Sequence, residues 1–259
     1  MSAASVTNER DTFDAVAADY HAVRPAYPSQ LFSDLADAIG DRARILEVGC
    51  GSGQATRGLL EQGWDVVAVD PGAELIALAK DSLSGRVAFH VARFEDFTPE
   101  PASFQLVASA QAWHWVDPAV GFAKAAAALG PGGSLAVFGH VPMPPPRDVV
   151  ARLAPVYAEI APELWDRVPP ETWYLPEGPV PALFDASGLF GVVAHKAYPW
   201  SERSSGRALA RQLSTRSYYN VLEGDRRERL LAEIEAALAP LGDFVLQHET
   251  HLYRASVLS

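Results

Sequence analysis

Three glycines in the segment ILEVGCGSG mark the clearest candidate for a binding site in this chain. Gly49, Gly51 and Gly53 lie where a short apolar run gives way to a helical pattern. Glycine lets the backbone approach a ligand closely, and the N–H groups that open a helix attract negative charge. We therefore predict a ligand-binding turn here, with a purely structural turn as the alternative.

Two common nucleotide-binding patterns do not fit this turn. Gly53 and Gly58 have the spacing of a Walker loop, but two leucines follow in place of Lys and Ser or Thr. A dinucleotide fingerprint needs a third glycine where this chain has Gln54 or Thr56, depending on which glycine is counted first. Neither class of ligand is indicated.

A second chemical group follows the apolar run FQLVASA, where Trp113, His114 and Trp115 are consecutive. An imidazole titrates near neutral pH, so His114 is a candidate general base. It could equally donate a hydrogen bond to a substrate carboxylate or to a backbone carbonyl. We expect Trp113 to face the reacting centre and Trp115 to pack in the interior; in the alternative, both rings are core residues.

The elements that position these groups alternate along the first half of the chain. Apolar runs lead into the glycine turn and then occupy 64–70, 86–92, 104–112 and 134–140, with helix-length segments between them. This alternation is typical of a parallel sheet covered by helices on both faces. We predict an α/β, doubly wound Rossmann-like fold, in which ligands bind beyond the carboxyl ends of the strands. The glycine turn and the Trp-His-Trp segment both lie at such ends.

The second half is less regular. After the proline-rich connector VPMPPPRD, the patterns indicate strands at about 192–200 and 243–257, and helices at about 147–166, 203–217 and 224–239. These strands complete a seven-stranded sheet that is mostly parallel, with an antiparallel last strand. We predict an N-terminal helical lid (1–40), a Rossmann-like core (41–140), and a last block (141–259) that adds the remaining strands and a helical cap with substrate-binding insertions.

Composition excludes several partners. The net charge is -11 and no Lys/Arg patch stands out, so we expect no nucleic-acid partner. The single cysteine, Cys50, rules out an internal disulfide and fits a reducing compartment. We find no apolar signal core and no membrane-length stretch, and so expect a cytoplasmic protein, monomeric or homodimeric. We predict no metal site, because His248 and His251 fall on opposite faces of a strand.

Four ordered segments resemble the class I S-adenosylmethionine (SAM) dependent methyltransferases. Glu47 through Gly53 is similar to their motif I, Asp70 ends the next strand, VARFEDF resembles the adenine segment, and LGPGGSLAVF resembles the turn before the fifth strand. The resemblance implies SAM as cofactor and S-adenosylhomocysteine as product. It implies that Glu47 and the loop hold the methionyl end, that Asp70 accepts hydrogen bonds from the ribose, and that Phe94 packs on the adenine. The implied cofactor residues are Tyr20, Arg24, Glu47, Gly49, Gly51, Gly53, Gln54, Asp70, Pro71, Phe94, Glu95, Ala110 and Gln111.

One departure from the family pattern concerns the adenine. Many relatives carry an aspartate that accepts a hydrogen bond from the adenine amine, whereas this chain has Arg93. Arginine has no acceptor. Glu95 or backbone carbonyls would have to replace it.

Two further segments narrow the resemblance to the trans-aconitate methyltransferase-like branch. DYHAVRPAYP and AQAWHWVD resemble its N-terminal segment, which closes over SAM, and its aromatic-His-Trp segment. The resemblance implies that Arg24 pairs with the SAM carboxylate and that Tyr20 shields the sulfonium; alternatively, Tyr20 and Tyr27 anchor a helix. The candidate substrate residues are Trp113, His114, Arg216 and Tyr218. The last two lie on a predicted cap helix; in the alternative, that helix face is simply solvated. Trp173, Tyr174 and Trp200 either line the acceptor pocket or pack the cap.

Together these features predict a SAM-dependent methyltransferase with a small-molecule acceptor. We expect O-methylation of a carboxylate or hydroxyl, with C- or N-methylation behind it. Two alternatives stay open: a SAM-binding enzyme that transfers no methyl group, such as a cyclase, and a ligand-sensing accessory subunit.

Overall fold

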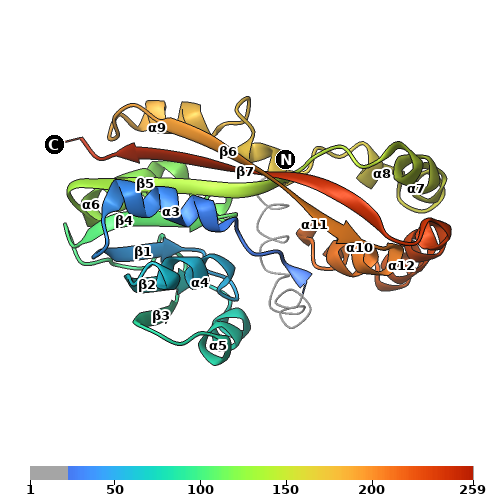
Figure 1. Ribbon diagram of the computed structural model, residues 1–259, viewed down its shortest axis with the longest axis horizontal. Coiled ribbons are helices and arrows are strands. Elements are labelled where there is room, and N and C mark those ends of the chain that lie inside the picture. Colours follow the sequence, from blue (N-terminus) through green and yellow to red (C-terminus); the bar gives the residue numbers. More distant parts are fainter. Residues whose placement is uncertain (1–22, 259) are drawn as a thin grey trace. The chain divides into compact units, whose positions relative to one another are not determined.

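The computed structural model describes residues 23–258, and its centre is one seven-stranded sheet (Figure 1). The strand order is β3-β2-β1-β4-β5-β7-β6. The strands are β1 (Arg44–Val48), β2 (Asp65–Asp70), β3 (Val87–Val91), β4 (Phe104–Ala110), β5 (Leu129–Pro142), β6 (Ala194–Ser204) and β7 (Phe244–Ser256).

Strand direction follows the prediction. β1 runs parallel to β2 and β4, β2 to β3, and β4 to β5. β7 is antiparallel to β5, because backbone bonds join Met143 to Gln247 and Val257 to Gly133. β7 is also antiparallel to β6. Just before β6 begins, the Gly191 N–H donates to the carbonyl of Ser256, the last residue of β7. The predicted fold, a mostly parallel seven-stranded sheet with an antiparallel last strand, is confirmed.

Helices of the first half follow the strands as expected. They are α3 (Ser29–Ile39), α4 (Gln54–Glu61), α5 (Ala73–Ser82) and α6 (Pro118–Ala128). The start of α6 has a simple local cause: Asp117 is its N-cap and accepts a hydrogen bond from the Ala119 N–H, while Pro118 supplies a preset φ at the first helical position.

The helices of the second half vary more in length. They are α7 (Arg147–Ile160), α8 (Pro162–Trp165), α9 (Val180–Ser187), α10 (Gly206–Leu213), α11 (Ser217–Asn220) and α12 (Gly224–Leu238). The 3-10 turns are η2 (Trp113–Trp115), between β4 and α6, and η3 (Pro170–Tyr174) and η4 (Ala239–Leu241) in the second half. The helix expected at 147–166 is thus split into α7 and α8, and the one at 203–217 is α10, which ends at Leu213.

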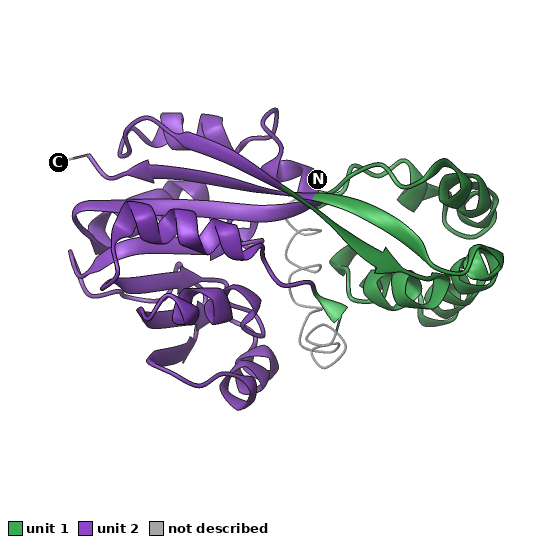
Figure 2. Ribbon diagram, viewed as in Figure 1, with its two compact units in different colours: residues 1–24, 142–170, 199–248 green, residues 25–141, 171–198, 249–259 purple. Residues whose placement is uncertain are grey.

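The chain divides into two compact units that are not sequential blocks (Figure 2). Among the described residues, unit 2 comprises 25–141, 171–198 and 249–258, and unit 1 comprises 23–24, 142–170 and 199–248. The segment 25–40, which we expected in the lid, therefore belongs with the sheet, where α3 packs. The chain leaves unit 2 and returns to it twice, because β5, β6 and β7 each contribute residues to both units.

Apolar cores cover both faces of the sheet in unit 2. In β1, Ile45 belongs to a cluster with Phe32 of α3, while its neighbour Leu46 belongs to another with Phe122 of α6. Successive strand residues point to opposite faces, so both faces carry helices. Unit 1 has its own core, to which α7, α10 and α12 contribute buried residues.

Candidate functional site

The glycine loop joins the end of β1 to α4. Gly49, Gly51 and Gly53 have φ values of 74°, 53° and 92°, which lie in the left-handed region that favours glycine. A Cβ on Gly49 would lie 2.2 Å from the Cβ of Ala112. The loop therefore packs directly against the segment that follows β4, and the two segments expected to do chemistry are neighbours.

Asp70 ties this loop to the end of β2. One carboxylate oxygen accepts from the Gly51 N–H and the other from the Gly72 N–H, both at 2.8 Å. The side chain is 8% exposed. Each carboxylate oxygen can accept more than one hydrogen bond, so Asp70 keeps capacity for ligand hydroxyls. Its predicted contact with a ribose stays a prediction.

Glu47 is a buried carboxylate beneath the same loop. Its side chain is 1% exposed; Oε2 accepts from the Thr56 hydroxyl at 2.6 Å, whereas the buried Oε1 has no hydrogen-bond partner. Burial raises the pKa of Glu47 to about 7, an effect that the Thr56 hydrogen bond opposes and the negative charge of Asp70 reinforces. A cation beside Oε1 would therefore be bound strongly.

Gln54 and Pro71 flank these carboxylates. Gln54 begins α4 and its amide bonds with the Ser52 hydroxyl. Pro71 is exposed between Asp70 and α5. Both lie beside the glycine loop, and their predicted contact with the cofactor stays a prediction.

Three contacts attach the segment that follows β3 to the turn η2 and the helix α6. Phe94 is only 2% exposed, and its ring packs on Trp113 at a centroid distance of 6.0 Å. The carboxylate of Glu95 accepts from the Asp117 N–H at 3.0 Å. Sequence reasoning missed the third contact: Lys124 of α6 donates to main-chain carbonyls of this segment. A single lysine on a predicted helix gave no signal of it.

The end of β4 carries local strain. Gln111, which follows Ala110, has a φ of 56°, a rare value for a residue other than glycine. Its side-chain amide accepts from the His140 N–H at 2.7 Å and donates to the His140 carbonyl at 3.2 Å. The Gln111 side chain thus fastens β4 to β5, which holds the left-handed conformation in place.

The structure reverses the burial that we expected of the two tryptophans. Trp113 is 2% exposed and packs edge-on against Phe122 at 5.3 Å, whereas Trp115 is half-buried. The reason is the tight turn η2, which directs Trp113 towards α6. Gly121 of α6 leaves room for Val116 at the end of this turn, since a Cβ there would lie 2.4 Å from the Val116 Cγ1.

His114 lies among aromatic rings. Its Nδ1 is 3.1 Å from the Tyr174 hydroxyl, and the rings of Trp115 and Trp173 lie at centroid distances of 4.8 and 6.0 Å. Burial raises the pKa of Tyr174 well above its ordinary value, so its hydroxyl stays protonated. Tyr174 therefore fixes one imidazole nitrogen of His114, and it belongs to unit 2 rather than to a cap.

A second imidazole lies at the same edge of the sheet. His140 ends the predicted fifth strand; its ring stacks on Tyr27 at 4.2 Å, and its Nδ1 is 2.8 Å from the Thr250 hydroxyl. The preceding residue, Gly139, makes room for Tyr174 and Gln111, since a Cβ there would lie 2.6 Å from the Tyr174 ring and 2.7 Å from the Gln111 Oε1.

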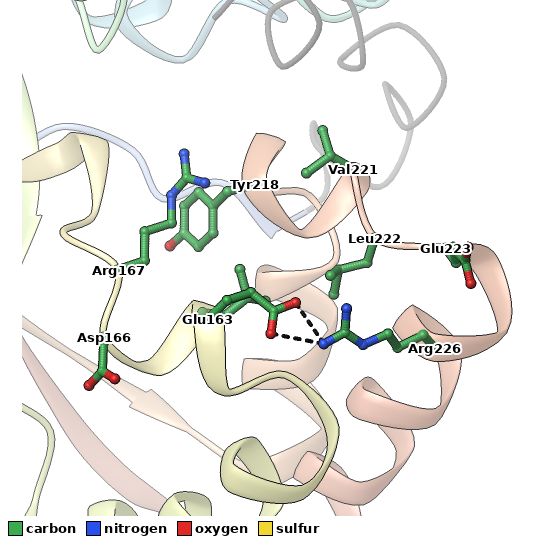
Figure 3. A pocket seen from close by; sticks show the side chains of 9 residues that line it. Glu163, Asp166, Arg167, Tyr218, Val221, Leu222, Glu223 and Arg226 are labelled. Atoms are coloured by element: carbon green, nitrogen blue, oxygen red, sulfur yellow. Dashed lines mark hydrogen bonds and ion pairs between the residues drawn. The ribbon is translucent and has the colours of Figure 1, made fainter. Parts of the chain in front are cut away.

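The remaining candidates lie in unit 1. Arg24 donates to the Thr215 carbonyl at 3.1 Å, and Arg216 donates to the Tyr218 hydroxyl at 3.1 Å. Tyr218 lines a cavity of about 650 Å³ (Figure 3), and the guanidinium of Arg167 lies 5.2 Å from the centre of its ring. The roles of these groups in ligand binding stay predictions. Tyr20 lies outside the described residues.

No cluster of three or more His, Cys, Asp or Glu side chains among residues 23–258 is arranged to hold a metal ion. None of the helices in this range has the length and apolar character needed to cross a bilayer.

Comparison with known proteins agrees with this geometry. Residues 45–133 match the family described as methyltransferase domain. The matched residues run from β1 into the start of β5 and include the glycine loop, Asp70 and the Trp-His-Trp segment. An uncharacterized methyltransferase of Mycobacterium tuberculosis is 38% identical over 124 residues, which are 48% of this chain and 50% of that protein. The chain spans about half the length of the curated relatives that it matches most strongly.

The likeness to solved structures extends beyond residues 45–133. A structure described as a type II methyltransferase from Anaeromyxobacter dehalogenans is 27% identical with a TM-score of 0.67, covering 90% of this chain and 97% of that one. Phosphoethanolamine N-methyltransferase 2 of Haemonchus contortus, solved with S-adenosylhomocysteine, is 17% identical with a TM-score of 0.55, covering 97% and 59%. The latter shows the fold alone.

Proposed function

We propose that this chain is a SAM-dependent methyltransferase that O-methylates a carboxylate or hydroxyl of a small molecule, leaving S-adenosylhomocysteine. One observation carries the proposal. Beside the glycine loop, at the carboxyl ends of the neighbouring strands β1 and β2, a buried Glu47 oxygen without a hydrogen-bond partner lies near the Asp70 carboxylate. SAM has an ammonium for the first group and ribose hydroxyls for the second.

The residues present fit that cofactor. Glu47 would hold the ammonium and Asp70 the ribose, whereas the N–H groups of Gly49, Gly51 and Gly53 already donate within the protein. Gly51 is already oriented by its bond to Asp70, so little ordering remains to be done on binding. When bound, SAM supplies an electrophilic methyl group, and the protein's task is to align the acceptor with it and to exclude water.

His114 is the proposed acceptor-side residue. With a hydroxyl acceptor it removes the proton; with a carboxylate acceptor no base is required, and it donates a hydrogen bond instead. The Tyr174 hydroxyl holds the imidazole in either case. Trp115 and Trp173 flank this ring and are the aromatic surfaces that we propose for the acceptor, while the buried Trp113 supports them from the interior.

We further propose an organic acid as the acceptor, in line with the resemblance to the trans-aconitate methyltransferase-like branch. Tyr27, from the N-terminal segment that carries this resemblance, stacks on His140 at the same sheet edge as Gln111. Two imidazoles at this edge favour an acidic ligand, because each can donate a hydrogen bond to a carboxylate.

Calorimetry tests the cofactor first. The purified chain is titrated with SAM and separately with NADH, and the SAM titration is repeated on Asp70→Ala. We expect micromolar binding of SAM that is lost in the variant and absent with NADH. No SAM binding by the unaltered chain refutes the proposal.

The transfer step is tested with methyl-labelled SAM and a panel of organic acids, phenols and amines. Label in an ester or ether supports O-methylation, and label in an amine or carbon product replaces it with N- or C-methylation. Product formation with SAM recovered intact identifies a non-methylating enzyme. Binding without turnover of any panel member favours an accessory subunit.

A further inference from the structure

Lys124 makes an unusual set of contacts for a helix lysine. Its ammonium donates to the carbonyl oxygens of Phe94, Glu95 and Phe97 at 3.0, 2.5 and 2.8 Å. A lysine ammonium has three donors, so all of them are used. The same ammonium lies 5.7 Å from the centre of the Phe94 ring. The side chain is half-buried in α6, beneath the segment that follows β3.

These contacts dictate which way the peptide groups of this segment face. Trans peptide units hold their C=O and N–H bonds in opposite directions, and the described chain has no cis peptide. The Phe94 carbonyl points at Lys124, so the Glu95 N–H points away from it. The Arg93 carbonyl accepts from the N–H groups of Asp96 and Phe97, which turns the Phe94 N–H outward as well.

Two kinds of contact attach this segment to α6: the hydrogen bonds of the Lys124 ammonium and a hydrogen bond of the Glu95 side chain. Hydrogen bonds from an ammonium are stronger than those between neutral groups. Glu95 adds a side-chain bond to the Asp117 N–H, at the start of the same helix. The helix α6 therefore fixes this segment at two points, through Lys124 and through the Asp117 N–H. A hydrocarbon side chain at position 124 could not replace the Lys124 hydrogen bonds.

We propose that Lys124 is a positioning residue for the nucleobase of the cofactor. By drawing the Phe94 carbonyl inward, it presents the Glu95 N–H, beside the outward Phe94 N–H, to the acceptor nitrogens of a purine. This backbone recognition takes over part of the role of the side-chain acceptor that Arg93 cannot provide. The proposal rests on the proposed function, since it assumes that SAM binds at the glycine loop.

The test compares Lys124→Met with Lys80→Met, an exposed lysine in the last turn of α5 that serves as matched control. Each purified chain is titrated with S-adenosylhomocysteine and with S-ribosylhomocysteine, which lacks the base. We expect Lys124→Met to weaken S-adenosylhomocysteine binding about tenfold, the weight of one well-placed hydrogen bond, without affecting the ligand that lacks the base. The control changes neither.

Kinetics and hydrogen exchange add readouts that a purely structural role would not produce together. In Lys124→Met we expect the KM for SAM to rise with kcat unchanged, and faster exchange confined to amides 93–98. Equal losses for both ligands, or an unchanged affinity for S-adenosylhomocysteine, overturn the proposal. If the unaltered chain binds S-ribosylhomocysteine but discriminates no base, only this inference fails; if it binds neither ligand, the proposed function fails first.

Discussion

Glu47 links the stability of the fold to pH. Its pKa is about 7 in the folded chain against an ordinary value of 4.5, so between these values the folded state keeps a proton that the unfolded state has lost. The free energy of unfolding therefore falls as pH rises through this window and stays lowered above it. This titration lowers the free energy of unfolding by about 3 kcal/mol at pH 8 and by about 1 kcal/mol at pH 5.

Glu47→Gln removes this titration while preserving shape. The new amide leaves an unpaired NH₂ at the position of Oε1, but that cost is the same at every pH and cancels when two pH values are compared. The change in unfolding free energy on substitution should thus be more favourable at pH 8 than at pH 5 by about 2 kcal/mol. For a chain of this size, that corresponds to roughly 4 °C or more in Tm.

Differential scanning calorimetry at pH 5, 6, 7 and 8 measures this difference. Glu61→Gln, an exposed position on α4, is the matched control and should show the same small effect at each pH. If Glu47→Gln shifts Tm by an equal amount at pH 5 and pH 8, the buried carboxylate is not titrating near neutrality and the reasoning is refuted. The variant should also bind SAM more weakly, since its ammonium loses a charged partner.

Three further substitutions test neighbouring contacts. Thr56→Val removes the donor that lowers the Glu47 pKa, so the pH window of the stability loss should move upward in calorimetry, and an unmoved window contradicts this. Tyr174→Phe should cost about 1 kcal/mol of stability and reduce kcat for hydroxyl acceptors more than for carboxylates; equal reductions would argue against a base role for His114. Gln111→Gly should be more stable in urea unfolding than Gln111→Ala by about 1 kcal/mol, because only glycine relieves the positive φ, and the reverse order would refute backbone strain there.

The parts of the site that follow from local pattern were predictable. Glycines at a strand-to-helix turn must face the carboxyl end of the sheet, and Asp70 ends the adjacent parallel strand, so their proximity followed from the alternation of elements alone. The position of His114 after β4 followed in the same way.

What the sequence left open depends on contacts between distant segments. Which tryptophan is buried depends on Phe122, across a tight turn, and not on the order of the letters in WHW. The contact of Lys124 is with carbonyls about 30 residues earlier, and main-chain atoms leave no trace in residue types. The two units could not be foreseen either, because their segments interleave along the chain.

The close approach of Gly49 to Ala112 has a consequence for redesign. The two positions share a single space, so any larger side chain at 112 pushes on the glycine loop, and any side chain at 49 pushes on the segment that carries His114. Attempts to broaden the acceptor range by mutating position 112 would therefore disturb cofactor binding at the same time. Trp115 and Trp173, which contact His114 without filling that space, are the positions at which selectivity can be altered independently.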